Sequence, residues 1–115
     1  MTRWIPCGER FIVGDVVRWT EPVWVEKGRR KKKLVKVGSR RVTAEVKTEG
    51  HSRGFVHLSV LQCEILTNLF ARSLEPLPKN HVVKRKRTTI GKGSGERLKW
   101  SEEGARALAV SKFVS

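Results

Sequence analysis

The stretch RRVTAEVK, residues 40–47, gives the clearest indication of secondary structure in the chain. Its apolar side chains recur at every second position, and polar or charged side chains stand between them. A period of two is the repeat of a β-strand, whose successive side chains point to opposite faces of a sheet. We therefore predict a strand with one face in a core (Val42, Ala44, Val46) and the other in solvent (Arg41, Thr43, Glu45, Lys47).

Further strands are predicted on the N-terminal side of this stretch. FIVGDVVRW, residues 11–19, is rich in β-branched and aromatic residues, and it predicts a strand from about Val16 to Trp19 after a turn at Gly14-Asp15. Glu21-Pro22 interrupts the apolar run, and VWVE (23–26) is expected to resume it as a short edge strand. LVKV (34–37) predicts another strand.

On the C-terminal side, FVHLSVLQCEIL (55–66) changes its pattern half-way. Alternate residues are apolar in one phase up to Val60 and in the opposite phase from Leu61, which predicts a β-bulge or a sharp bend between them. The spacing of Leu61, Ile65 and Leu69 also fits a helical stripe. We prefer a strand to about Leu66, which Thr67-Asn68 would end.

Charge is concentrated in two blocks. The chain has 115 residues and a net charge of +14. Residues 27–41 contain nine cationic residues and no acidic one, and residues 84–99 contain seven cations against Glu96. The remainder is nearly neutral, as expected of a body that folds conventionally and carries two electrostatic attachments.

These patterns predict a mainly β protein in which short antiparallel strands curl into a small barrel. The expected organisation is a β-barrel body over residues 1–75 and a basic flexible arm over residues 76–100, where glycines and cations dominate. A short C-terminal helix is predicted over residues 101–113, with Ser101 as its N-cap.

The stretch FIVGDVVRW also resembles the opening of SH3-like barrels of the KOW type, in which a Gly-Asp pair turns the chain into an apolar first strand and a basic loop follows. The similarity lies in Gly14, Asp15, Val17 and the cations of Lys27–Lys33. This resemblance implies a small SH3-like barrel that associates with RNA or DNA.

Several kinds of site are not expected. Cys7 and Cys63 form no C-x-x-C motif, and the three histidines have no zinc-ligand spacing, so we expect no metal, no cofactor and thiols in a reducing compartment. The glycines of GKGSG (91–95) do not fit a phosphate-binding loop and are interpreted as linker residues. With neither a signal-peptide pattern nor a long apolar stretch, a cytoplasmic location is expected, in the nucleoid or nucleus if the ligand is DNA.

The candidate site consists of the two basic blocks and one aromatic residue. Residues 27–33 are predicted to form the tip of a hairpin, a basic finger that can follow a phosphate backbone. Trp24, next to this tip, is a candidate for stacking on a base, whereas Trp19 is expected to lie in the core. The predicted nucleic-acid-binding residues are Trp24, Lys27, Arg29, Arg30, Lys31, Lys32, Lys33, Lys36, Arg40, Arg41, Lys84, Arg85, Lys86, Arg87 and Lys92.

The leading hypothesis is a non-enzymatic protein that binds DNA or structured RNA through phosphate contacts with low sequence specificity. One alternative is a protein-interaction module that docks onto a larger nucleoprotein complex or a phage or plasmid target. A further alternative is a small SH3-like ribonuclease toxin, because GDVVRW is similar to the first strand of such enzymes. No membrane partner is expected, and the sequence leaves the oligomeric state open.

Overall fold

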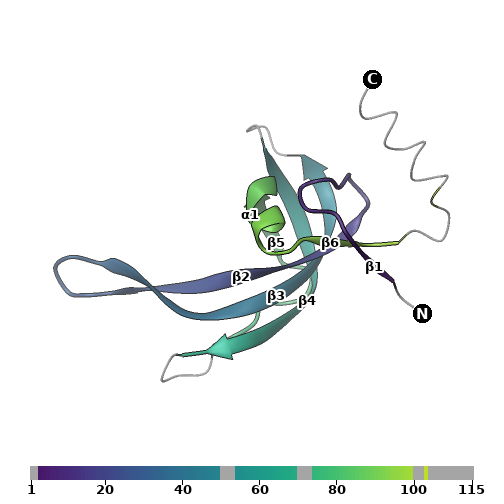
Figure 1. The fold of residues 1–115 in the computed structure, drawn as a ribbon. Coiled ribbons are helices and arrows are strands. Elements are labelled where there is room, and N and C mark those ends of the chain that lie inside the picture. The colour runs from purple at the N-terminus through teal and green to yellow at the C-terminus, as the bar shows by residue number, and fades with distance from the viewer. Residues whose placement is uncertain (1–2, 50–53, 70–73, 100–102, 104–115) are drawn as a thin grey trace.

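The structure, a computed structural model, describes residues 3–49, 54–69, 74–99 and 103. Figure 1 shows one antiparallel sheet of six strands, in the order β1-β6-β2-β3-β4-β5, with a short helix beside it. The elements are β1 (Trp4–Pro6), β2 (Val16–Lys27), β3 (Lys33–Glu49), β4 (Phe55–Asn68), β5 (Val82–Lys86), α1 (Arg87–Lys92) and β6 (Glu96–Leu98). The mainly β prediction is confirmed.

Strand β3 contains the alternating stretch from which the fold was predicted. Val42, Ala44 and Val46 are fully buried, while Arg41 and Lys47 are exposed, so the predicted strand and its two faces are confirmed. The strand is longer than the alternation indicated, because it also takes in the predicted strand at residues 34–37 and pairs with β2 along its length.

Strand β2 continues through Glu21-Pro22, so the predicted interruption there is wrong. The Glu21 side chain is buried, and Glu21 pairs with Arg40 while Pro22 pairs with Ser39. Strand β6 pairs with β2 only at Val17 and Arg18. At Pro22, β2 therefore pairs with β3 alone among the described strands. Proline has no backbone N–H to donate, and this is tolerated where one side of the strand is unpaired.

Strand β4 contains the predicted bulge. Ala44 of β3 pairs with Val60, and the neighbouring Thr43 pairs with Gln62, so Leu61 is the additional residue that opposes no partner. The phase of the apolar side chains changes at this residue, as the sequence indicated, and the strand interpretation of residues 55–66 is confirmed over the helical one.

The core lies on the concave face of the curled sheet. It consists of Phe11, Val17, Trp19, Val42, Ala44, Val46, Val56, Leu58, Val60, Val83 and Ile90. Helix α1 carries Ile90, which is fully buried, and the helix lies over this face between β5 and β6 (Figure 1). The sheet is not closed into a barrel, because the strand order ends at β1 on one side and at β5 on the other, and these two edge strands are not paired with each other.

The prediction of a flexible arm over residues 76–100 is wrong. These residues supply β5, α1 and β6, and two apolar residues among the cations, Val83 and Ile90, anchor them in the core. The glycines interpreted as a linker are also packed. Gly93 accepts a hydrogen bond from the Thr20 amide, and a Cβ atom at Gly93 would collide with the Thr20 carbonyl oxygen.

The predicted C-terminal helix over residues 101–113 lies outside the described residues apart from Glu103. The carboxylate of Glu103 accepts two hydrogen bonds from the Arg97 guanidinium, both at 3.1 Å. This bidentate contact ties residue 103 to strand β6.

Candidate nucleic-acid interface

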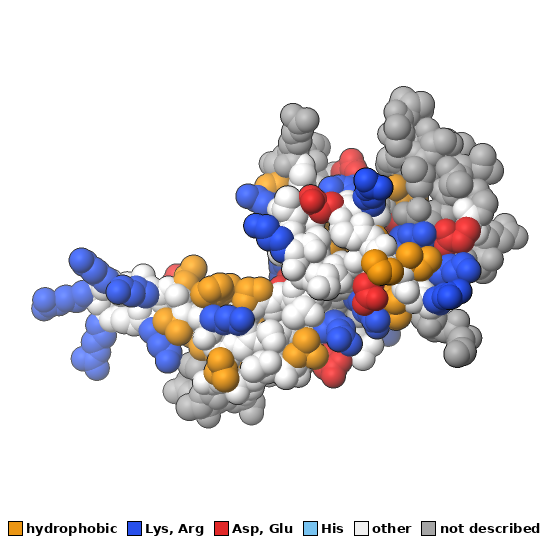
Figure 2. Space-filling model, in the orientation of Figure 1, with side chains coloured by type: hydrophobic (Ala, Val, Ile, Leu, Met, Phe, Trp, Pro, Cys, Tyr) orange, Lys and Arg blue, Asp and Glu red, His pale blue; other side chains and the backbone are white. Residues whose placement is uncertain are grey.

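The β2–β3 hairpin extends well beyond the rest of the sheet (Figures 1 and 2). Strand β4 last pairs with β3 at Gly38, whereas the β2–β3 ladder continues from Trp24↔Lys36 to Lys27↔Lys33. We call this two-stranded part, residues 24–36, the finger. The five residue steps of β3 from Gly38 to Lys33 correspond to roughly 17 Å of strand.

The end of the finger is a five-residue loop, Gly28–Lys32, closed by the Lys27↔Lys33 pair. Gly28 has a φ of 117°, and a Cβ atom there would collide with the carbonyl oxygen of Lys31, so the turn requires glycine. The predicted basic site residues of the finger are all exposed, and Figure 2 shows Lys and Arg side chains spreading around its end. They are Lys27, Arg29, Arg30, Lys31, Lys32, Lys33 and Lys36.

The ion pair between Lys32 and Glu26 is a weak one. The Lys32 Nζ lies 3.8 Å from a carboxylate oxygen of Glu26, but the two side chains are 70% and 61% exposed, so the pair contributes little to holding Lys32 in place. At physiological salt the Debye length is about 8 Å, which exceeds the spacing of neighbouring residues in the loop. The cations therefore reinforce one another as one positive patch.

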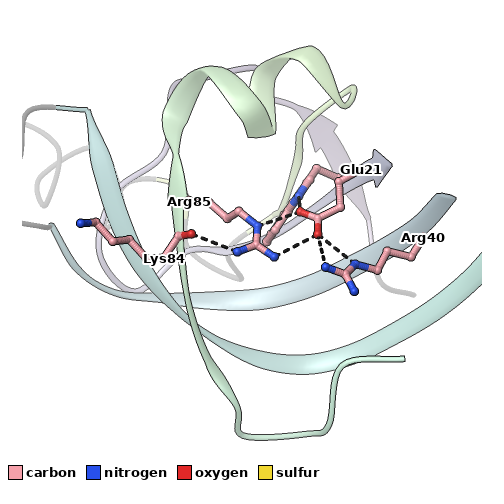
Figure 3. A network of polar contacts seen from close by, with 5 residues as sticks. Glu21, Arg40, Lys84 and Arg85 are labelled. Atoms are coloured by element: carbon pink, nitrogen blue, oxygen red, sulfur yellow. Dashed lines mark hydrogen bonds and ion pairs between the residues drawn. The ribbon is translucent and has the colours of Figure 1, made fainter. Parts of the chain in front are cut away.

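Arg40 and Arg85 were predicted to bind nucleic acid, but both are engaged with the carboxylate of Glu21 (Figure 3). Glu21 Oε2 accepts hydrogen bonds from Arg40 Nη2 at 2.7 Å and from Arg85 Nη2 at 3.0 Å. Glu21 Oε1 accepts from Arg85 Nε at 2.9 Å and from the indole Nε1 of Trp19 at 2.7 Å. The first task of these two arginines is thus to neutralise a buried acid.

The environment of Glu21 changes its titration. Burial alone raises the pKa of a carboxyl group, but here the hydrogen bond and positive charge of Arg85 outweigh it, with further hydrogen bonds from Trp19 and Arg40. The net result is a pKa of Glu21 below its ordinary value, so this carboxylate is ionised at neutral pH. Trp19 is buried in the core, as predicted.

The KRKR block of residues 84–87 is divided by the geometry of strand β5. Lys84 and Lys86 are exposed, and their Nζ atoms lie 4.5 and 5.4 Å from the centre of the Phe55 ring. Arg85 turns to Glu21, and Arg87 donates to the carbonyls of Glu9 and Phe11 and to the carboxylate of Glu49. Only the two lysines keep the exposed position that the site prediction assigned to all four residues.

Two other predicted residues lie away from the finger. Lys92 is exposed in the last turn of α1. Arg41 is exposed on the face of β3 opposite Arg40, where it lines a small hollow of about 230 Å³ with Trp4 and Arg18. The Arg18 guanidinium lies 4.2 Å from the centre of the Trp4 ring and 2.9 Å from Glu96. Sequence reasoning missed this cluster, since no local pattern places β1 beside β6.

Trp24 lies at the root of the finger and is 52% exposed. It lines a hollow of about 380 Å³, which we call the root hollow, and the residues around this hollow come from three strands and the helix. The other lining residues are Glu21, Pro22, Val23, Arg40, Arg85 and Thr89. Trp24 therefore keeps an accessible ring surface beside the two arginines.

Comparisons of the chain with protein families, with curated proteins and with solved structures find no match. Among the described residues, no three His, Cys, Asp or Glu side chains are grouped so that they could hold a metal ion. The helical part of the described chain has no segment of the length and apolarity needed to cross a membrane.

Proposed function

We propose that the protein is a non-enzymatic nucleic-acid-binding protein whose basic finger contacts the phosphate backbone. The observation that carries this proposal is the placement of the cations at the exposed end of a two-stranded ribbon that projects from a well-packed sheet. A solubilising charge would serve as well if it were scattered, whereas a projecting patch presents its charge to one surface of a partner.

The dimensions of the finger favour a groove-bound ribbon. The major groove of B-DNA is about 12 Å wide and 8.5 Å deep, and it admits a two-stranded β-ribbon. A finger of roughly 17 Å is long enough to reach the floor of such a groove while the sheet stays outside the helix. On structured RNA, whose major groove is deep and narrow, the same cations would contact the phosphates along its edges.

Low sequence specificity is expected of this contact. Lysines make up most of the basic positions in the finger, and a flexible ammonium acts as a point charge on phosphates. Arg29 and Arg30 are the finger residues with the fork geometry that can read a guanine edge. Lys84 and Lys86 on strand β5 supply a second, weaker set of phosphate contacts.

The relationship to KOW-type, SH3-like domains is part of the same proposal. A strongly curled antiparallel sheet with a basic loop after an apolar strand supports it. Two other functions are the alternatives: docking onto an acidic protein of a larger nucleoprotein complex, and ribonuclease activity. The binding experiment is designed to distinguish both from nucleic-acid binding.

The test is electrophoretic or fluorescence binding to a labelled DNA duplex and an RNA hairpin at 50 to 300 mM salt. In the finger variant, Arg29, Arg30, Lys31, Lys32 and Lys33 are replaced by Ser. We expect the slope of log Kd against log salt to fall by about 4 to 5, near 0.9 for each lost phosphate contact. A control variant loses the same charge from exposed positions off the finger (Arg3, Arg10, Lys47, Lys79 and Lys99 to Ser).

Equal affinity of the finger variant and the wild type would refute the role of the finger. An equal loss of affinity in the finger variant and the control variant would show that binding depends on net charge alone. Shortening of the RNA in the presence of chelator would indicate a nuclease instead. Copurification of a protein that survives nuclease treatment, without affinity for either probe, would favour the docking function.

A further inference from the structure

The root hollow combines features that the finger itself lacks. Pro22, Val23 and Trp24 of β2 give it an apolar side, and Arg40 and Arg85 give it a cationic one. Its volume of about 380 Å³ is within the usual range of small-ligand sites, which starts near 300 Å³. A ligand with one planar apolar part and one anionic part would match both sides.

The hollow has a net positive charge and spare hydrogen-bond donors. Two guanidinium groups share the single carboxylate of Glu21, which leaves one uncompensated positive charge. Each guanidinium has five N–H donors. Arg40 uses two of them on Glu21, while Arg85 uses two on Glu21 and one on the Lys84 carbonyl.

The remaining donors are reachable from solvent. The side chains of Arg40 and Arg85 are 17% and 23% exposed, and among the described residues no buried side-chain nitrogen or oxygen lacks a partner. Because Glu21 fixes both guanidinium groups, their free N–H groups are held in place before a ligand arrives. Fixed donors lose little entropy on binding an anion such as phosphate.

Trp24 supplies the planar surface. The residue is 52% exposed, and an exposed indole on a paired strand is the kind of platform on which nucleobases stack. Lys36 is the residue opposite Trp24 in the β2–β3 ladder, so a cationic residue of the finger is its cross-strand neighbour. A nucleic acid bound along the finger therefore passes close to the opening of the root hollow.

We propose that the root hollow holds one unpaired nucleotide, whose base stacks on Trp24 and whose phosphate accepts hydrogen bonds from Arg40 and Arg85. This inference rests on the proposed function and makes it more specific: the ligand is a helix with an unpaired nucleotide, and the finger binds the helical part. Stacking is tolerant of base identity, so the preference is for an unpaired base and not for a sequence.

The experiment compares three probes of equal length with the full-length protein: a fully paired duplex, the same duplex with a one-nucleotide bulge, and that bulge with an abasic residue. Each is made as DNA and as RNA. We expect the bulged duplex to bind at least about fivefold more tightly than the paired one, the lower end of the contribution of base stacking. The abasic bulge keeps the phosphate and should lose most of this preference.

The test variant is Trp24→Ala, and its matched control is Leu34→Ala, which removes another exposed apolar side chain of the finger, 66% exposed, outside the root hollow. Trp24→Ala should abolish the preference for the bulge, so that the paired and the bulged duplex bind equally. Leu34→Ala should keep the preference for the bulge. Arg40 and Arg85 are not used as test positions, because their loss would leave the buried Glu21 unpaired.

Three results would overturn the inference. The first is equal binding of paired and bulged probes by the wild type, and the second is a bulge preference that persists in Trp24→Ala or with the abasic probe. The third is that a short acidic peptide competes with the bulged probe for the protein while nucleoside monophosphates do not, and that this competition is lost in Trp24→Ala. Paired-duplex binding that still depends on the finger would show that the nucleotide site alone has failed and the proposed function has not.

Discussion

Glu21 and Arg40 face each other across the β2–β3 ladder, and Arg40 Nη2 lies 2.7 Å from Glu21 Oε2. They stand where the hairpin leaves the rest of the sheet, and Arg85 of β5 joins them from the far edge of the sheet. The network therefore connects three strands below the root of the finger (Figure 3).

Replacement of Glu21 should destabilise the fold. In Glu21→Gln, Arg40 and Arg85 lose the charge that compensates them in a largely buried place, and we expect a loss of about 3 to 5 kcal/mol in the free energy of unfolding. Urea denaturation measures this. Glu26→Gln is the control, because Glu26 is exposed on the finger, and it should change stability by less than about 0.5 kcal/mol. Similar effects of the two substitutions would contradict the structural role of Glu21.

The same carboxylate predicts a particular acid sensitivity. The pKa of Glu21 is lower in the folded chain than in the unfolded one, so its contribution is present in full above the unfolded value. That contribution is lost as the pH falls from the ordinary value of 4.5 through the lower folded value. Thermal unfolding measured between pH 7 and pH 2 should show a shallower acid decline for Glu21→Gln than for the wild type. Parallel curves for the two proteins would show that Glu21 does not contribute to the loss of stability in acid.

The residues of the KRKR block should separate into two classes. Lys84→Ser with Lys86→Ser should leave stability nearly unchanged and reduce the salt slope of nucleic-acid binding by about 2. Arg85→Ser removes two hydrogen bonds and a positive charge from the buried carboxylate of Glu21. This substitution should instead cost about 3 to 5 kcal/mol of stability. Denaturation and binding measured on both variants distinguish the classes. If both variants bind weakly and fold equally well, the block acts as one uniform basic segment.

Limited proteolysis with trypsin tests which of the two basic blocks is cleaved first. Exposed loop tips are preferred cleavage sites, whereas a paired strand must open before it can be cut. The first cuts within the described residues should therefore fall in the loop from Gly28 to Lys32, ahead of residues 84–87. Mass spectrometry of early fragments identifies them. Early cleavage after Lys84 or Lys86 would contradict the pairing of β5 with β4.

Much of the central sheet could be predicted because its information is local. The alternation around Val42 specifies which face of β3 is buried, and the change of phase at Leu61 specifies the bulge. The prediction for residues 76–100 was wrong because it was based on the high content of cations and glycines and gave no weight to single apolar residues. Val83 and Ile90 are isolated among polar and charged neighbours, and one buried side chain in each element suffices to anchor it once a core exists.

The sequence by itself determined that the chain is mainly β, where its charge lies, and that a basic turn within residues 27–33 joins two strands. Only the tertiary structure decided which cations are available to a ligand. Arg40 and Arg85 are 45 positions apart in the chain, and they meet Glu21 because β2, β3 and β5 curl around one core. A charge pattern records the type of each side chain, whereas its availability depends on partners that folding brings from distant parts of the chain.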